Sequence, residues 1–230
     1  VILFASGAKS VVMAEEMKEK VIILHSGWMD STVCLLLALE KDWEVLSFGI
    51  NYGQSSQIEL EYASRLCERF DVERKVLNVR WDKPERTIPE NRALDEIGKD
   101  ISPAFMPGRN ALFLVLGCAE AAGIGASEVW IGVNSVDYSG YPDCRPEFLE
   151  QFKKMIQLAI PNGPAITAPL MSLSKPEIAK EALRSGLGRN DTWSCYRPVK
   201  CENEFKACGQ CDACVLHNYA WENVLIETET

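Results

Sequence analysis

The sequence predicts an α/β protein, a Rossmann-like parallel sheet with helices on both faces, with a small four-cysteine metal site near the C-terminus. Short apolar runs alternate with helical patterns along most of the chain, which is typical of βαβ units. Near the C-terminus, Cys208, Cys211 and Cys214 form two overlapping CxxC turns, and Cys195 lies on the preceding loop. Four thiolates suit one tetrahedral metal ion.

The order of these patterns places each expected element. We expect strands at 21–25, 44–50, 74–79 and 128–133, and helices at 32–40, 57–70, 110–122, 146–158 and 174–186. The last clear helix is predicted to begin at Ser174, with Glu177 closing a capping box, and to end near Gly186. Segment 138–143 is too rich in turn residues for the core. We expect it to form a loop over the carboxyl ends of the strands, where such sheets bind ligands.

Composition narrows the function classes. The 230 residues, 47% of them hydrophobic, suit one compact domain, which we place at 17–230 with residues 1–16 as an extension. A net charge of -9 disfavours nucleic-acid binding and favours a small-molecule substrate. The apolar run at 1–6 is too short to span a membrane. Nine cysteines without a secretory signal indicate a cytoplasmic protein.

The cysteine segment 195–214 predicts a closed, structural zinc site with ligands Cys195, Cys208, Cys211 and Cys214. Cys201 and His217 are competing fourth ligands, and iron could also occupy four thiolates. The alternative is that some of these thiols are buried or redox-active cysteines. Three others (Cys34, Cys67 and Cys118) lie on apolar helix faces and are expected in the core.

The turn after the first strand predicts an anion site. Residues 21–24 lead into His25-Ser26-Gly27-Trp28-Met29-Asp30-Ser31 and then a helix, so backbone N–H groups and the positive helix end face the turn. Pyrophosphate fits such a turn, with Ser26 and Ser31 donating to its oxygens and Asp30 holding Mg²⁺. This is neither a Walker loop nor GxGxxG. An ordinary βα turn is the alternative.

The turn resembles the Ser-Gly-Gly-x-Asp-Ser motif of the PP-loop ATP-pyrophosphatases, whose fold is adenine nucleotide alpha hydrolase-like, with Trp28 in place of the second glycine. From about residue 20 to 218 the chain is similar to the 7-cyano-7-deazaguanine synthase family. The motifs that carry this resemblance are Tyr52-Gly53-Gln54, 105–110, 132–134, 137–148, 169–171, 194–196 and the cysteine cluster.

The resemblance implies a homodimeric ligase of the queuosine (preQ0) pathway. Such an enzyme uses ATP and Mg²⁺ to adenylate the carboxylate of 7-carboxy-7-deazaguanine, and ammonia then gives an amide and finally a nitrile. We expect catalytic roles for Asp30, Ser31 and Arg109. The expected ATP site comprises Leu24, Ser26, Gly27, Trp28, Met29, Asp30, Ser31, Gln54 and Arg109. The expected substrate site comprises Asn134, Asp137, Tyr141, Asp143, Arg145 and Phe148.

The departures from the family pattern lie near the chemistry. Besides Trp28, the family's Tyr-Gly-Gln-Arg-His is Tyr-Gly-Gln-Ser55-Ser56 here, and His217 stands where an Arg is usual. One alternative is therefore a relative that stops at the amide or transfers the acyl group to a protein amine, as in a defence system. A second is a non-catalytic deazapurine-binding module. A tRNA-modifying PP-loop enzyme is disfavoured, because this acidic chain has no basic RNA-binding extension.

Overall fold

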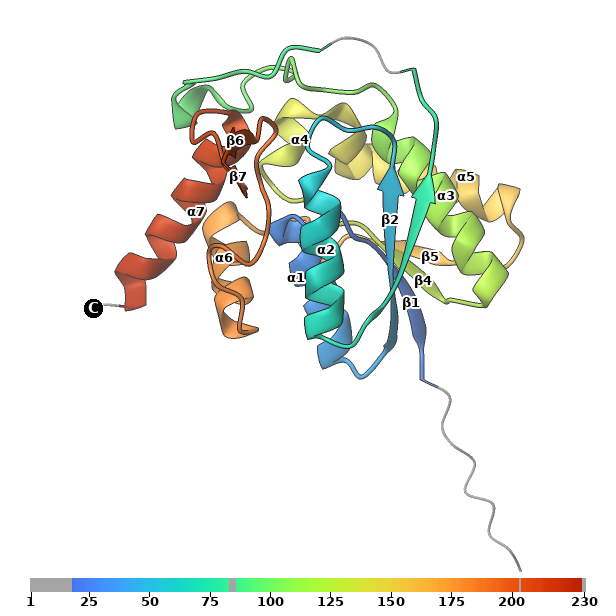
Figure 1. Cartoon of the computed structure of the whole chain (residues 1–230). Coiled ribbons are helices and arrows are strands. Elements are labelled where there is room, and N and C mark those ends of the chain that lie inside the picture. The colour runs from blue at the N-terminus through green and yellow to red at the C-terminus, as the bar shows by residue number, and fades with distance from the viewer. Residues whose placement is uncertain (1–17, 83–85, 203, 229–230) are drawn as a thin grey trace, which may run out of the picture.

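The computed structural model describes residues 18–82, 86–202 and 204–228, and its centre is a five-stranded parallel sheet (Figure 1). The sheet has the order β3-β2-β1-β4-β5. Its strands are β1 (Lys20–Leu24), β2 (Glu44–Asn51), β3 (Glu73–Asn78), β4 (Glu128–Trp130) and β5 (Ala165–Thr167). In the register, Ile22 of β1 lies opposite Leu46 of β2 and Val129 of β4. The predicted extension at 1–16 lies outside the described residues.

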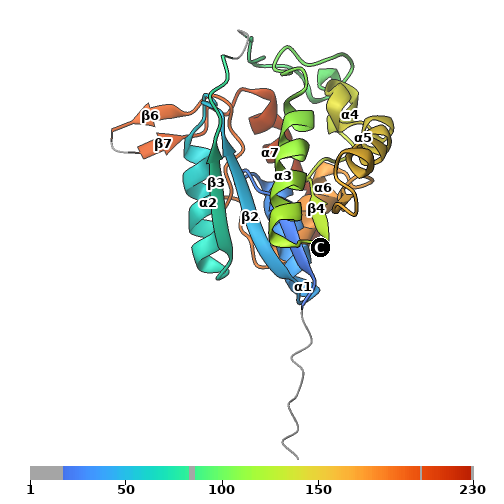
Figure 2. The ribbon, with the colours of Figure 1, turned by 90° about the vertical axis from the view of Figure 1, so that its right-hand side faces the viewer.

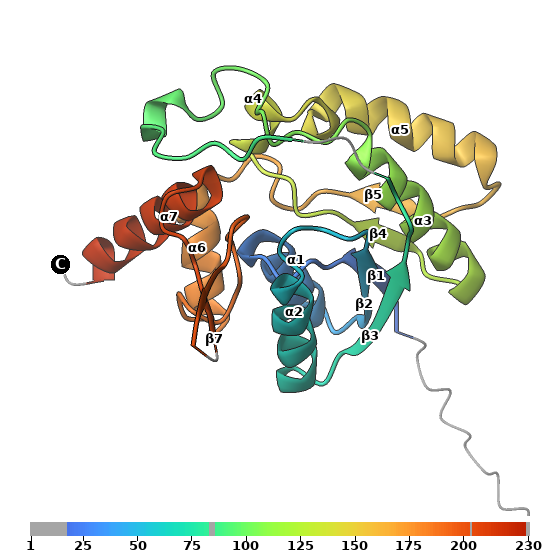
Figure 3. The ribbon, with the colours of Figure 1, turned by 45° about the horizontal axis from the view of Figure 1, so that its top comes forward.

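Helices cover both faces of this sheet. They are α1 (Met29–Glu40), α2 (Ile58–Arg69), α3 (Arg109–Ile124), α4 (Asp137–Gly140), α5 (Pro146–Ala159), α6 (Lys175–Arg184) and α7 (Asp212–Thr228). Val21 and Ile23 of β1 point into a core with α1, α2, α6 and α7, whereas Ile22 and Leu24 point into a second core with α3 and α5. Figure 3 shows these two helical layers on either side of the strands. The predicted fold class is confirmed.

The structure also contains elements that the sequence patterns did not indicate. The expectation that the helix after Ser174 is the last one is wrong, because α7 follows the cysteine segment and packs against α6. An antiparallel hairpin of β6 (Val199–Cys201) and β7 (Glu204–Lys206) extends from the body of the molecule (Figure 2). Strand β4 ends at Trp130 rather than near 133. The expected loop at 138–143 instead includes most of α4 and the start of a 3-10 turn, Pro142–Cys144.

Two further predictions, one on a helix boundary and one on the core, are confirmed. The capping box at Ser174 is formed, since Glu177 Oε2 accepts from the Ser174 backbone N–H at 2.7 Å. Cys34, Cys67 and Cys118 are buried, as expected of core residues. In the described part of the chain, no helix is both long enough and apolar enough to cross a membrane.

Candidate active site

A cavity opens at the carboxyl ends of β1, β2 and β4, where the fold predicts ligand binding. We call it the first cavity. Its floor is the loop between β1 and α1, and its walls come from the segment after β2 and from the start of α3. Seven residues of the expected ATP site line it: Leu24, Ser26, Trp28, Asp30, Ser31, Gln54 and, on its α3 side, Arg109. Gly27 and Met29 do not line it.

The loop between β1 and α1 has a conformation suited to an anion. The Ser26 and Ser31 hydroxyl oxygens are 3.1 Å apart, and Ser31 Oγ also accepts from the Ser26 backbone N–H at 3.2 Å. Gly27 has φ +95°, and a Cβ there would lie 2.2 Å from the Glu59 carbonyl oxygen, so only glycine fits. Trp28, by contrast, has φ -78° and ψ 158°, which any residue adopts. The missing second glycine therefore leaves the loop backbone unstrained.

His25 supports this loop from below. Its ring is buried between Ser47 Oγ, 2.9 Å from Nδ1, and Thr32 Oγ1, 3.1 Å from Nε2. Burial, assisted by the charge of Arg74, lowers the pKa of His25 to about 3, so the ring is neutral. It connects the residue directly after β1 to the first turn of α1 and to β2, which fixes where the loop begins and ends.

The Trp28 side chain is built into the cavity wall. Its Nε1–H donates to Glu59 Oε2 at 2.7 Å, and its ring lies 4.9 Å from the Tyr196 ring, centroid to centroid. Gln54 Nε2 donates to the other Glu59 oxygen at 3.0 Å. Burial raises the pKa of Glu59 to about 7, although both hydrogen bonds oppose the shift. Glu59, which the sequence patterns did not single out, thus holds Trp28 and Gln54 in place.

The shifted pKa of Glu59 predicts how stability depends on pH. Between pH 4.5 and about 7 the folded protein keeps a proton that the unfolded chain releases, so stability falls as the pH rises through this window. Over the whole window the loss amounts to about 3 kcal/mol. Glu59→Gln removes the titrating group. We expect its free energy of unfolding, measured in urea, to lose this pH dependence relative to wild type.

Glu61→Gln is the matched control for that measurement, because Glu61 is exposed on the same helix. Each variant is measured at pH 5 and at pH 8, and only the change in its difference from wild type is interpreted. A hydrogen bond that glutamine makes less well than glutamate lowers stability equally at both pH values, so it cancels in this comparison. Identical pH profiles for wild type and Glu59→Gln would contradict the prediction.

A second cavity adjoins the first. Trp28, Asp30, Asp137, Tyr141, Lys175 and Tyr196 line both cavities. The remaining walls of the second cavity come from segment 92–102, the α4 region and the first turns of α7. Tyr141 and Tyr196 stand at the boundary, with their hydroxyl oxygens 3.3 Å apart. The two cavities therefore meet at one small group of charged and aromatic side chains.

Lys175 lies at this meeting point, between two carboxylates. Its Nζ donates to Asp30 Oδ2 at 2.9 Å and is 4.0 Å from Asp137 Oδ1. Burial alone would lower the pKa of Lys175, but the charges of Asp30 and Asp137 raise it above its ordinary value. Burial raises the pKa of Asp137 to about 6, against the opposing effect of Lys175. The second oxygen of Asp30, Oδ1, is buried and has no hydrogen-bond partner among the described residues.

Only some of the residues expected to bind the substrate lie at the two cavities. Asp137 and Tyr141 line both cavities, and Asn134 is buried behind them with its Nδ2 donating to Asp137 at 2.6 Å. Asp143, Arg145 and Phe148 line neither cavity. Asp143 accepts from the Asn110 backbone N–H at 3.0 Å in the first turn of α3, Arg145 is exposed, and Phe148 packs on Phe152. A substrate role for these three stays a prediction.

Two serines at the family's Arg-His position connect the first cavity to the cysteine segment. Ser56 is buried and accepts from Trp193 Nε1 at 2.8 Å, and the exposed Ser55 hydroxyl donates to the Tyr196 carbonyl at 3.3 Å. The Trp193 backbone N–H also donates to the Gly27 carbonyl at 3.0 Å. The chain at and just before the cysteine segment is therefore hydrogen-bonded both to the segment after β2 and to the loop between β1 and α1.

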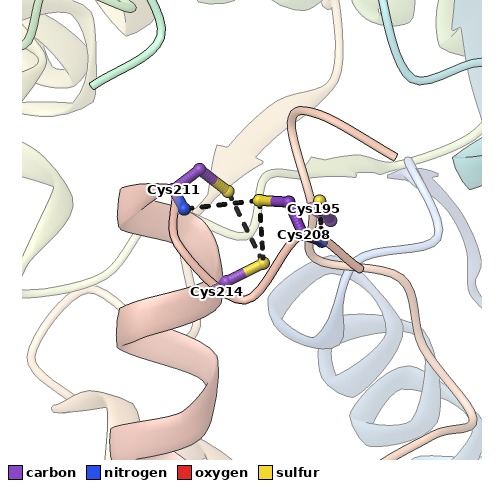
Figure 4. A group of neighbouring side chains, drawn as sticks. All are labelled: Cys195, Cys208, Cys211 and Cys214. Atoms are coloured by element: carbon purple, nitrogen blue, oxygen red, sulfur yellow. Dashed lines mark hydrogen bonds between the residues drawn. The ribbon is translucent and has the colours of Figure 1, made fainter. Parts of the chain in front are cut away.

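The four predicted metal ligands form one cluster. The sulfur atoms of Cys195, Cys208, Cys211 and Cys214 all lie within 4.8 Å of one another (Figure 4). Two of these sulfurs also accept backbone N–H groups: Cys195 Sγ from Cys208 at 3.2 Å, and Cys208 Sγ from Cys211 at 3.4 Å. Such donors stabilise thiolates. Four close, mostly buried sulfurs in this arrangement can hold a metal ion.

The two competing ligands lie elsewhere. Cys201 is on β6 and is not part of the sulfur cluster. His217, on α7, lies 3.0 Å through Nε2 from the Arg189 carbonyl oxygen, and its ring packs near Trp221. Cys195 is the fourth member of the cluster, as the sequence predicted.

The chain is similar in sequence to proteins of one known family. The family model described as queuosine biosynthesis protein QueC matches residues 20–225. The chain is 52% identical over 207 residues to 7-cyano-7-deazaguanine synthase 2 of Rhodopseudomonas palustris, covering 90% of this chain and 99% of that relative. It is 40% identical over 210 residues to 7-cyano-7-deazaguanine synthase of Novosphingobium aromaticivorans, covering 87% and 89%.

Among solved structures, NMN synthetase from Francisella tularensis matches with a TM-score of 0.49 and 12% identity, covering 90% of this chain and 84% of that one. At this level the structural likeness adds nothing to the sequence comparisons. The family match spans the sheet, both cavities and the cysteine cluster. The chain therefore belongs to the family of the queuosine biosynthesis protein QueC.

Proposed function

We propose that this ligase uses ATP to adenylate the carboxylate of 7-carboxy-7-deazaguanine and aminates it with ammonia, first to the amide and then to the nitrile. The observation that carries the proposal is the meeting of two cavities at Lys175, Asp30 and Asp137. A reaction between a nucleotide and a second small molecule needs two adjoining sites with charged groups at their boundary.

ATP occupies the first cavity in this proposal. Phe48, Ile50 and Phe113 supply an apolar wall suited to adenine, while the loop at 26–31 and the N-terminal end of α1 receive the phosphates. Arg109, at the start of α3, supplies a cation on the opposite wall. Asp30 Oδ1, a buried oxygen that no described residue hydrogen-bonds, fits Mg²⁺, which prefers carboxylate and phosphate oxygens and would neutralise phosphate charge.

The deazaguanine ring occupies the second cavity. Trp28, Tyr141 and Tyr196 offer aromatic faces for a flat heterocycle, and Asp137 offers an acceptor. The substrate carboxylate then points to the boundary, where the Lys175 ammonium is held. Lys175 reduces the repulsion between the carboxylate and the phosphates, and it stabilises charge that develops on the α-phosphate.

The chemistry proceeds in two activations. A carboxylate oxygen attacks the α-phosphorus of ATP and pyrophosphate leaves, which gives the acyl adenylate. Ammonia attacks the acyl carbon, AMP leaves, and one proton is lost to give the amide. In the second activation, the amide oxygen attacks the α-phosphorus of a new ATP and pyrophosphate leaves. Loss of AMP and of both amide protons then gives the nitrile. The dry wall formed by Trp28 and the two tyrosines protects the adenylate from water.

Zinc is the metal we propose for the cysteine cluster. Four sulfur donors within 4.8 Å of one another suit its tetrahedral preference, and a closed set of four protein ligands leaves no position for substrate. The role is structural: Tyr196 follows Cys195 directly, and Asp212 follows Cys211, so the cluster fixes two walls of the second cavity.

The test is mass spectrometry of the products after incubation with ATP, Mg²⁺, ammonium and 7-carboxy-7-deazaguanine. We expect the nitrile, with AMP and pyrophosphate. If only the amide or the acyl adenylate forms, nitrile synthesis is excluded, and the protein is instead a ligase with another acceptor, such as a protein amine. Absence of ATP turnover would overturn the proposal in favour of a binding module.

A further inference from the structure

The wall of the second cavity that is formed by α7 carries a residue that the proposed mechanism leaves unused. His217 lines this cavity together with Leu216 and Ala213. Its Nδ1 is buried and has no hydrogen-bond partner among the described residues. A buried polar atom without a partner costs free energy in the folded protein, so a ligand that satisfies it gains affinity.

The other ring nitrogen of His217 decides what Nδ1 can do. Nε2 lies 3.0 Å from the Arg189 carbonyl oxygen, which can only accept, so Nε2 carries the proton. Arg189 is itself held, because its Nη2 donates to Asn218 Oδ1 at 2.7 Å. Burial lowers the pKa of His217 and keeps the ring neutral at neutral pH. Nδ1 is therefore unprotonated, and its lone pair can only accept a hydrogen bond. The bond of Nε2 to the Arg189 carbonyl fixes the orientation of the ring.

The cations of the second cavity are already engaged. Lys175 donates to Asp30, and Arg92 donates to Asp212 with Nε 3.0 Å from Oδ1. Among the residues the structure describes, the buried side-chain atoms of this cavity that lack partners are Asp30 Oδ1 and His217 Nδ1, and both are acceptors. The cavity therefore favours a ligand that brings N–H donors.

A flat ligand with two different ends fits this arrangement. One end of the second cavity is the boundary with the first cavity, where Lys175 suits a carboxylate, and His217 also lines the second cavity. The aromatic side chains of the second cavity suit a flat ring. We propose that His217 is a specificity-determining residue that accepts, through Nδ1, a hydrogen bond from the N–H edge of a guanine-type base. This inference rests on the proposed function, and it assigns the residue that distinguishes guanine-type from adenine-type rings.

The test compares two ligands that differ at this edge. A guanine-type ring presents a ring N–H and an amino group there, whereas 7-carboxy-7-deazaadenine presents a bare ring nitrogen and a C–H. Calorimetry without ATP measures the Kd of each for wild type and for two variants. His217→Phe keeps a ring but has no acceptor, and His217→Asn restores an acceptor near the position of Nδ1.

We expect wild type to prefer the guanine-type ligand by at least tenfold, since a polar group left unpaired costs about 1–3 kcal/mol. His217→Phe should lose at least tenfold in affinity for that ligand and most of the preference, and His217→Asn should recover much of both. Affinity for ATP and KM for ammonium should not change. Thermal unfolding of each variant checks that it is folded.

Two results would overturn the inference. One is an unchanged preference in a folded His217→Phe variant. The other is a raised KM for ammonium with unaltered base binding, which would place the attacking amine beside His217 instead. Failure of wild type itself to bind 7-carboxy-7-deazaguanine is a separate result, and it would overturn the proposed function.

Discussion

Replacing Lys175 with methionine is expected to lower kcat/KM for AMP formation by at least about 100-fold, the usual effect of removing one preorganised charge from a transition state. Methionine keeps the length of the side chain and removes only its ammonium. Lys175 Nζ is the cation held between Asp30 and Asp137 where the two cavities meet. Without it, the substrate carboxylate would approach the phosphates beside two buried carboxylates.

The same change also affects the fold, so the assay must separate the two effects. Removing one partner of a buried ion pair leaves an uncompensated charge and costs about 3–5 kcal/mol. Lys175→Arg keeps the charge in a larger, planar group. It should therefore remain close to wild type in stability while losing activity, because the guanidinium cannot occupy the position of a compact ammonium.

Lys180→Met is the matched control, since Lys180 is exposed on the same helix. Steady-state kinetics at saturating Mg²⁺ and thermal unfolding are measured for all three variants. A folded Lys175→Met variant with kcat/KM within threefold of wild type would contradict a role for this ammonium in the reaction.

The features that the sequence predicted are those fixed by short-range spacing. The loop at 26–31 and the two overlapping CxxC turns at 208–214 each carry their signal within a few residues. The alternation of apolar runs predicted the sheet. Trp28 shows where spacing stops being informative. The sequence shows that the second glycine of the motif is replaced, but whether this strains the loop depends on φ and ψ, and these are ordinary at Trp28.

The features that the sequence did not predict depend on contacts between distant segments. Lys175 pairs with Asp30 across 145 residues, and from the sequence alone it was only the first residue of a capped helix. Glu59 is an ionisable residue in the first turn of a helix, where exposure is the usual expectation, and its importance depends on its hydrogen bond to Trp28. Helix α7 was not predicted from the sequence, because it begins within the second CxxC spacing, which was interpreted as a turn.

Loss of the metal is expected to have the second large effect. Cys211→Ser should reduce bound metal, measured as zinc and iron per chain by mass spectrometry, to well below one. Structural zinc sites contribute about 10–16 kcal/mol of apparent binding energy in small domains, so a melting temperature about 10 °C lower or more is expected. Cys201→Ser is the control, because Cys201 lies on the neighbouring hairpin outside the cluster. It should keep its metal and its stability.

The pattern of kinetic change distinguishes a structural metal from an incidental one. Tyr196 and Asp212 follow two of the ligands and line the second cavity, while much of the first cavity comes from β1, β2 and α3. Partial removal of metal by a chelator should therefore raise KM for 7-carboxy-7-deazaguanine more than KM for ATP, by about tenfold or more if Tyr196 loses its position. Full activity in a metal-free protein would contradict this coupling. So would equal loss of metal from Cys201→Ser, because the ligand set would then differ from the four sulfurs that the fold brings together.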